Sequence, residues 1–511
     1  MRAHEKQGGK WLETLFYKLI YDKRLKRSMT ILELLYKAKY TTTIKELEEA
    51  LQISKRTVLS TLEFAKTLLP DSLSLEIADK NVRLQNDDEQ SIDDVLIDIA
   101  KETISYQVLK HTFYDGNLTI RKLSEKLFIS ESALRARIAH MNKALRPFKC
   151  SISFYDVKIQ GDETNIRYLY YTYFSEFQEL FIASCEDQLS YCSDVYQKMK
   201  KLLEKHDSKL LNYSYQQVAR WLLITRERME LGKFVQIKPS FAKRVRVRPS
   251  YQDFKLVYES EIDRHMDRIQ VPEAEVIWAY IVGFNTVVYT SDNQEKALSR
   301  GEEENWVDTG KIAAILAEMM DTLGIQQADR ENFAAVHTAY LVNLSLLTEI
   351  SPIFQMGSET VRNYVMDNLG RCYGAWYKRL SNLHGRALWP IVHVQSVSAQ
   401  LAMLSAAFSY RQKTQAEKIL YSFEGEAGFP LYLETLARTL LPKGVEGVFI
   451  YDEPITDELV RQTQADIVVC NYQMQEKIQG CKTLKMSTVP LIQEWTLLRE
   501  LIINTNYNRT R

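Results

Sequence analysis

Two segments in the N-terminal third of the chain are copies of one pattern. Residues 43–69 and residues 119–145 align without a gap at an offset of 76 residues. Each copy begins with a threonine whose hydroxyl can accept an unpaired N–H at the start of a short helix. After a two-residue turn, Ser54 or Ser130 can cap a second helix in the same way. This repeat constrains the fold most strongly, because it predicts the same helical hairpin twice.

The apolar spacing predicts how the second helix of each copy packs. Its apolar residues recur at steps of 4, 3 and 4, as a helix that buries one face requires. They are Val58, Leu62, Ala65 and Leu69 in the first copy, and Leu134, Ile138, Met141 and Leu145 in the second. A strand-like alternation with turns at 79–81 and 155–156 follows the copies and predicts a β-hairpin after each. The sequence therefore predicts two winged helix-turn-helix units, with 31–39 and 92–113 as their preceding helices.

The charge is arranged in blocks, although 66 Lys and Arg residues balance 66 Asp and Glu residues overall. Residues 1–66 carry 14 basic against 8 acidic residues, and residues 117–161 carry 9 against 3. The acidic stretch 87–99 between them has no basic residue. A helical hairpin that binds no nucleic acid could also show this pattern if it occurred only once. Two winged copies, each with a basic block, favour DNA binding.

Base-contacting residues are expected at the front of each second helix, because that end enters the major groove. The candidates are Lys55, Arg56, Thr57 and Ser60 in the first copy, and Ser132, Arg135 and Arg137 in the second. Arg56 and Arg135 are the first choices, because a guanidinium can form two hydrogen bonds with guanine. Glu131 would repel phosphate and is expected to favour the helix N-terminus instead. Lys122 and Lys126 are expected to touch phosphates or water.

The remaining composition is ordinary for a globular protein. The 511 residues exceed one hydrophobic core, so about three to five domains are expected. The six cysteines form no CxxC pair, so neither a disulfide framework nor a zinc site is predicted, and a reducing cytoplasm is expected. There is no apolar run of 18 residues and no apolar signal core, so no membrane contact is expected. Apolar residues from Trp11 to Leu19 predict an amphipathic helix packed on the first domain.

The middle of the chain, from about 165 to 415, has a helical pattern and contains several histidines. His206 and His265 lie 59 residues apart, and His337 and His393 lie 56 residues apart. Spacing alone indicates ordinary surface or core histidines.

The last hundred residues alternate apolar strands with helices, which predicts a small parallel α/β sheet. Strands are expected at 419–423, 445–451 and 465–471, and helices at 429–441 and 492–503.

These features together resemble the Mga/AtxA type of virulence gene regulators. The resemblance rests on the tandem helix-turn-helix units, the two helical blocks, and His206 followed by Leu211, Asn212 and Tyr213. It implies a mainly α multidomain fold with a small C-terminal α/β domain. The implied ranges are winged helix-turn-helix units at 1–85 and 86–163, helical regulation domains at 164–290 and 291–415, and an enzyme IIB-like domain at 416–511.

The resemblance also implies control by the sugar phosphotransferase system. The regulation domains would be transient targets of its phosphocarrier protein, with His206, His265 and His337 as phosphorylation sites. An exposed imidazole with a pKa near 6.5 is partly neutral at cell pH and nucleophilic. A phosphoryl group adds negative charge that can reorder a helix contact. His393 is an additional candidate by spacing only.

The C-terminal domain resembles enzyme IIB of the same system, but it departs from the pattern at one position. In true IIB enzymes a phosphate-accepting cysteine follows the first strand. Here that loop, 422–430, reads SFEGEAGFP and has no cysteine. Cys470 ends a later strand and is expected to be buried. We therefore expect this domain to support a homodimer or to sense a signal rather than to transfer phosphate.

Two other functions stay open. RNA-binding antiterminators carry similar histidine-bearing domains, but they begin with a small β-rich domain. A phosphotransferase enzyme component is disfavoured by the missing cysteine. The sequence has no GxxxxGK[ST], HExxH or GxGxxG motif, so no enzyme activity, metal or cofactor is predicted. The leading prediction is a cytoplasmic, homodimeric regulator that binds double-stranded DNA.

Overall fold

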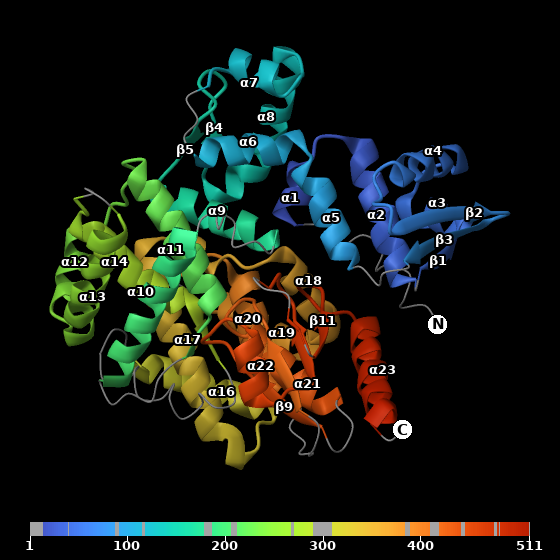
Figure 1. The fold of residues 1–511 in the computed structure, drawn as a ribbon. Coiled ribbons are helices and arrows are strands. Elements are labelled where there is room, and N and C mark those ends of the chain that lie inside the picture. The colour runs from blue at the N-terminus through green and yellow to red at the C-terminus, as the bar shows by residue number, and fades with distance from the viewer. Residues whose placement is uncertain are drawn as a thin grey trace. The chain divides into compact units, whose positions relative to one another are not determined.

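The computed structural model describes residues 14–38, 40–86, 91–114, 118–177, 186–205, 212–266, 270–289, 309–383, 389–408, 418–440, 445–474, 478–479 and 481–509. Over these residues the fold is mainly helical, and it divides into two compact units. The N-terminal unit contains Met1–Gly161, Ser175–Phe177 and Leu491–Thr496, and the C-terminal unit contains Asp162–Phe174, Gln178–Pro490 and Leu497–Arg511. Figure 1 colours the chain from blue to red along its length. This division into two units does not test the five predicted domain ranges, which stay predictions.

The first winged helix has the element order that the repeat predicts. Its elements are α2 (Lys23–Lys37), β1 (Thr41–Thr43), α3 (Ile44–Leu51), α4 (Lys55–Lys66), β2 (Leu73–Ala78) and β3 (Asn81–Asn86). The predicted caps are confirmed, because Thr43 accepts the N–H of Glu46 and Ser54 accepts the N–H of Thr57. The strands form an antiparallel sheet in the order β1-β3-β2. Helix α2 begins earlier than predicted, because Asp22 caps its first turn.

The second winged helix has the same pair of helix-turn-helix helices followed by a shorter hairpin, but two helices precede this pair instead of a helix and a strand. Its elements are α5 (Ile92–Lys101), α6 (Ile104–Phe113), α7 (Ile120–Lys126), α8 (Glu131–Leu145), β4 (Ser151–Ile152) and β5 (Ile159–Gln160). Thr119 and Ser130 cap α7 and α8 as predicted. The single helix predicted over 92–113 is wrong, because Thr103 accepts the N–H of Tyr106 and starts a second helix there.

The buried stripes of α4 and α8 lie where the spacing predicts them. Their fully inaccessible side chains are Val58, Leu62, Ala65, Leu134, Ile138, Met141 and Leu145. Leu69 lies beyond the end of α4 and is only half-buried. Burial of each large aliphatic side chain contributes about 1.5–3 kcal/mol, so these stripes are a main source of stability for both winged helices.

Helix α1 (Leu15–Leu19) packs on α6 and α8 of the second winged helix and also contacts α2 of the first. The Ser105 hydroxyl of α6 donates to the Leu19 carbonyl over 2.7 Å, and His140 Nε2 of α8 lies 2.9 Å from the Lys18 carbonyl. The predicted contact with the first domain is present, because the Tyr17 hydroxyl of α1 lies 3.0 Å from the Thr30 hydroxyl of α2, but the packing on the second winged helix was not predicted. An apolar face at helical spacing shows that a helix is buried, but it does not show against which partner.

The C-terminal unit is built mainly from helices. They are α9 (Glu163–Glu176, which ends in the N-terminal unit), α10 (Glu186–Lys205), α11 (Tyr215–Glu230), α12 (Pro239–Arg246), α13 (Pro249–His265), α14 (Glu273–Val282), α16 (Thr309–Leu323), α17 (Arg330–Ile350), α18 (Glu359–Asn368), α19 (Gly370–Ser381) and α20 (Val394–Ala407). Two short strands, β6 (Asn212–Tyr213) and β7 (Val287–Val288), pair antiparallel. The segment Gln327–Ile350 is long and apolar enough to cross a membrane, but 78% of its apolar window is buried inside the protein, as in a core helix.

Buried charges connect α9, α11 and α14. The guanidinium of Arg167 is inaccessible and donates to the two carboxylate oxygens of Glu275 over 2.7 and 2.9 Å. Arg228 donates to both oxygens of Glu163 over 2.8 Å. Glu275 also accepts the N–H of Val235. Because charges inside a protein are stable only when paired, this network fixes how the three helices meet.

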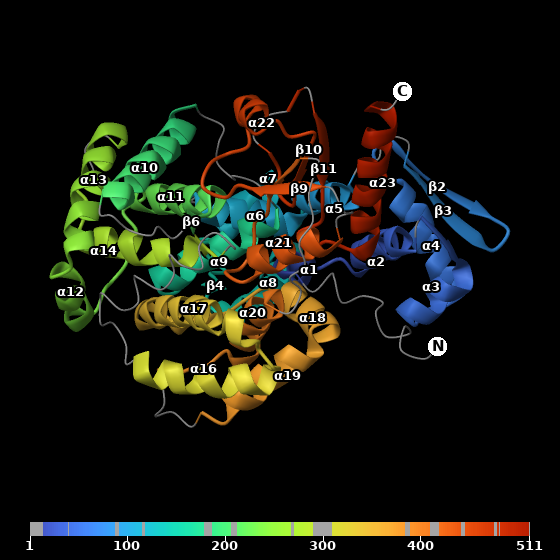
Figure 2. The ribbon, with the colours of Figure 1, turned by 90° about the horizontal axis from the view of Figure 1, so that it is seen from below.

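The predicted parallel sheet is confirmed. Strands β8 (Lys418–Ser422), β9 (Glu446–Phe449), β10 (Ile467–Cys470) and β11 (Lys482–Lys485) are all parallel, in the order β11-β10-β8-β9. Leu420, Val468 and the buried Cys470 share a core with Leu459 and Val460 of α22 (Asp457–Thr463). The sheet and its helices α21 (Phe429–Leu440) and α22 are among the orange and red elements in Figure 2. Helix α22 and the edge strand β11 were not predicted, because both are short and largely polar.

The last helix, α23 (Ile492–Arg509), begins at the predicted residue.

Candidate nucleic-acid interface and histidine sites

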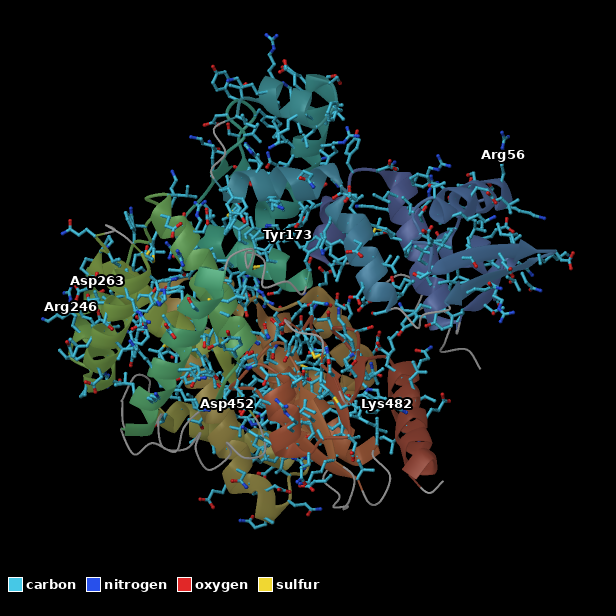
Figure 3. All side chains as sticks on the ribbon, viewed as in Figure 1. Arg56, Tyr173, Arg246, Asp263, Asp452 and Lys482 are labelled. Atoms are coloured by element: carbon cyan, nitrogen blue, oxygen red, sulfur yellow. The ribbon has the colours of Figure 1, made fainter. Side chains whose placement is uncertain are left out.

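The front of α4 presents its four candidate residues in different ways. Lys55 and Arg56 are exposed, and Figure 3 shows the Arg56 side chain pointing away from the ribbon. The hydroxyl of Thr57 lies 3.0 Å from that of Ser54, so it belongs to the helix cap. Ser60 is exposed, but its hydroxyl donates to the Thr57 carbonyl. Lys55 and Arg56 have no ion pair within the part of the chain that the structure describes, which leaves their charges available to a ligand.

In α8 the structure separates the two arginines that the sequence grouped. Arg135 is exposed, and its Nη1 donates to the Phe154 carbonyl of the wing over 3.2 Å. The guanidinium of Arg137 lies 5.3 Å from the centre of the Tyr21 ring and is half-buried. Ser132 is exposed in the first turn. Arg135 and Ser132 therefore face solvent at the front of the helix, whereas Arg137 contacts the segment that follows α1.

Arg24 is a basic residue beside the first interface that the sequence gave no reason to select. It lies in α2, is exposed, and donates through Nη2 to the Ser60 carbonyl of α4 over 3.2 Å. Its guanidinium also lies 4.3 Å from the centre of the Phe64 ring. It adds a positive charge close to Ser60. Only the packing of α2 on α4 could reveal this contact.

The predicted acceptor His265 lies at the end of α13 in a cluster of charges. Its Nε2 is 3.2 Å from a carboxylate oxygen of Asp194 in α10 and 3.7 Å from one of Glu261. These three residues offer donor atoms of types that bind metal ions. Arg264 pairs with Asp194 over 3.0 Å, and Lys198 pairs with Glu261. Each of the two carboxylates therefore already has a cationic partner.

His337, in contrast, is a core residue. Its side chain is fully inaccessible, with Nδ1 2.7 Å from the Phe333 carbonyl and Nε2 3.0 Å from the Ser405 hydroxyl. Burial lowers the pKa of His337 to about 4, so the ring is neutral. The sequence predicts an exposed imidazole at His337. That prediction is wrong, because α17 turns the ring into the core. His206 lies outside the described residues, and His393 is half-buried at the start of α20.

The loop that lacks the enzyme IIB cysteine is bound to helices of the C-terminal unit. Glu424 pairs with the buried guanidinium of Arg220 in α11. The carboxylate of Glu426 accepts the N–H of Ser358, next to the start of α18. Burial raises the pKa of Glu426 to about 8. The loop therefore holds helices in place with its carboxylates and has no cysteine.

Comparison with known proteins agrees with this geometry. Residues 22–80 match the M protein trans-acting positive regulator (MGA) HTH domain, and residues 88–174 match the Mga helix-turn-helix domain. The chain carries the helix-turn-helix domains of an Mga-type regulator. The two matches include the helix-turn-helix elements α3–α4 and α7–α8, and together with the relatives they support a DNA-binding transcription regulator.

Its relatives carry names of the same kind. A protein named as a trans-acting regulator, from Streptococcus pneumoniae serotype 4, is 25% identical over 358 residues, which cover 68% of this chain and 70% of the relative. The capsule synthesis positive regulator AcpB of Bacillus anthracis is 22% identical over 282 residues, 54% of this chain and 57% of AcpB. AcpA, also a capsule synthesis positive regulator of that species, is 24% identical over 146 residues, 28% of this chain and 30% of AcpA. The aligned parts cover less than two thirds of AcpB and of AcpA.

Proposed function

We propose that this regulator reads duplex DNA with the fronts of α4 and α8. The observation that carries the proposal is that each helix is capped by a serine, is buried along one face, and exposes an arginine, Arg56 or Arg135, in its first two turns. Such an end fits the major groove, where arginine recognises guanine. Lys55 and Ser132 are the adjacent contacts. Thr57, Ser60 and Arg137 act mainly by holding the helices in position.

The test is binding of the full chain to labelled duplex DNA selected from a random library. Duplex RNA of the same sequence separates this function from that of an RNA-binding antiterminator. Affinity for DNA should fall steeply with salt, because bound phosphates release counterions. Equal affinity for RNA, or an affinity that salt does not change, would contradict the proposal.

We further propose that the sugar phosphotransferase system controls the regulator through His265 and His206. The phosphoryl group would pass from a phosphohistidine of the carrier to a ring nitrogen of His265, whose proton would return to the carrier. The support at His265 is local, because Lys198 and Arg264 lie in the same cluster and can form charge-assisted bonds with a phosphoryl group. Incubation with the phosphotransferase enzymes and phosphoenolpyruvate, followed by mapping of acid-labile phosphate, tests this. Label on neither histidine would contradict it.

We also propose a cytoplasmic homodimer that forms through the last hundred residues. Ile492 in α23 supports this, because its large apolar side chain is 81% exposed and would be covered by the partner in a dimer. The names of AcpA and AcpB favour positive control of transcription. Sedimentation of the full chain should give the mass of a dimer, and Ile492→Asp should lower that mass. A full chain that sediments as a monomer would contradict the dimer.

A further inference from the structure

The two wings meet their helix-turn-helix units at equivalent places. Ile44 and Ile120 are equivalent in the repeat and are the first residues of α3 and α7. The N–H of Ile44 donates to the Lys80 carbonyl over 2.9 Å, and the N–H of Ile120 donates to the Tyr155 carbonyl over 3.0 Å. Lys80 and Tyr155 therefore occupy the same place in the two winged helices. Sequence alignment does not show this match, because the second wing is one residue shorter at that point.

Both side chains project into solvent from a fixed backbone. Tyr155 is 77% exposed, although its N–H donates to the Ser153 hydroxyl over 3.2 Å. The carboxylate of Asp156 is bound by the same hydroxyl over 2.5 Å. Lys80 is exposed in the two-residue turn between β2 and β3. A single exposed aromatic ring is common, but this one shares its position with a lysine in the other copy.

The second wing is also continuous with the interface on α8. The side chain of Asn142 donates to the Ile152 carbonyl over 2.9 Å and accepts the Ile152 N–H over 2.6 Å. Arg135, the leading base contact of α8, donates to the Phe154 carbonyl. Because α8 holds the wing at two points, a duplex that reaches Arg135 lies beside Tyr155.

We infer that Lys80 and Tyr155 are the wing contacts of this regulator with duplex DNA. This inference rests on the proposed function and deepens it. Lys80 supplies one positive charge to a backbone phosphate. Tyr155 donates its hydroxyl to a phosphate oxygen and lays its ring against the sugar edge. Contacts of this kind position the protein and carry little sequence information, so the base specificity stays with α4 and α8.

The test uses the full chain and the selected duplex, with affinity measured by fluorescence anisotropy over a series of salt concentrations. Lys80→Ala should reduce the slope of log affinity against log salt by about 0.9, the value for one lost phosphate contact. Tyr155→Phe should weaken binding by about two- to tenfold, the range for one lost hydrogen bond, without changing the slope. Tyr155→Ala should weaken it further.

Matched controls keep the test specific. Phe128→Ala removes a 95% exposed aromatic side chain from the turn between α7 and α8, and Lys378→Ala removes an exposed lysine from α19. Both should bind as the wild type does. Unfolding curves of all variants check that they fold.

The outcomes separate the two proposals. If Arg135→Ala weakens binding while Lys80→Ala and Tyr155→Ala keep both affinity and slope, the wing contacts are refuted and the proposed function stands. If Arg135→Ala and Arg56→Ala also bind normally, the proposed function itself fails. If Phe128→Ala loses as much affinity for the duplex as Tyr155→Ala does, the effect does not depend on the position of the aromatic residue in the wing. That result would also refute the inference.

Discussion

The carboxylate of Glu424 pairs with the guanidinium of Arg220, and both side chains are nearly inaccessible. Arg220 lies in α11, whereas Glu424 follows β8, so one ion pair joins the helical part of the C-terminal unit to its parallel sheet. In an enzyme IIB this loop would hold a cysteine for phosphate transfer. In this chain the loop has no cysteine, and its carboxylate joins the sheet to α11.

This pair predicts a large stability loss from one substitution. Arg220→Met should lower the free energy of unfolding by about 3–5 kcal/mol, because it leaves the Glu424 charge buried without its partner. Urea denaturation measures the change. Arg246→Met is the matched control, because its pair with Glu273 is exposed to solvent and should contribute little to the free energy of unfolding. Equal losses in the two variants would contradict a structural joint at Arg220.

Glu426 predicts a dependence of stability on pH. Its pKa is raised by burial from 4.5 to about 8 in the folded chain, so the folded state holds the proton more tightly than the unfolded state. The resulting stabilisation is complete below pH 4.5 and is lost as the pH rises through about 8. Glu426→Gln cannot ionise, so its melting temperature should rise relative to the wild type as the pH increases from 4.5 to about 8. Thermal melts at a series of pH values measure this difference, and a constant difference would contradict it.

The two arginines of α8 predict different effects on DNA binding. Arg135→Ala should cost about 1–3 kcal/mol of binding free energy, the range for a lost base contact. Arg137→Ala should weaken binding less and should reduce thermal stability, because its guanidinium packs on Tyr21. Anisotropy with the selected duplex and thermal melts of each variant give both quantities. The reverse order of affinities would place Arg137 rather than Arg135 in the groove.

Two of the described candidate histidines, His265 and His337, also predict different behaviour. His337→Ala should lower the free energy of unfolding by about 2–4 kcal/mol, because it opens a cavity and leaves the Ser405 hydroxyl without one partner. His265→Ala should have a smaller effect on stability and should remove acid-labile label. Denaturation and phosphate mapping on the same samples check this. Label that persists in His265→Ala and disappears in a folded His337→Ala would reverse the assignment.

Much of the N-terminal unit could be predicted because its signals are local. Thr43, Ser54, Thr119 and Ser130 each cap a helix with an N–H only three residues away, and the buried stripes repeat within a single helix. The strands of the C-terminal sheet were predictable for a similar reason, since they are short, continuous apolar runs. Signals of this range are present in the sequence itself. They determined the two winged helices, the parallel sheet and the exposed front of α4.

The tertiary structure decided what depends on partners distant in the sequence. The partner of α1, the engagement of Arg137 with Tyr21, the burial of His337 beside Ser405 and the pairing of Arg220 with Glu424 all join residues that no local pattern connects. The match of Lys80 with Tyr155 likewise became visible only through the hydrogen bonds of Ile44 and Ile120. A side chain's type and spacing indicate that it will be buried or charged. Which group it meets is decided by the packing of whole elements, because only that packing brings the two groups within reach.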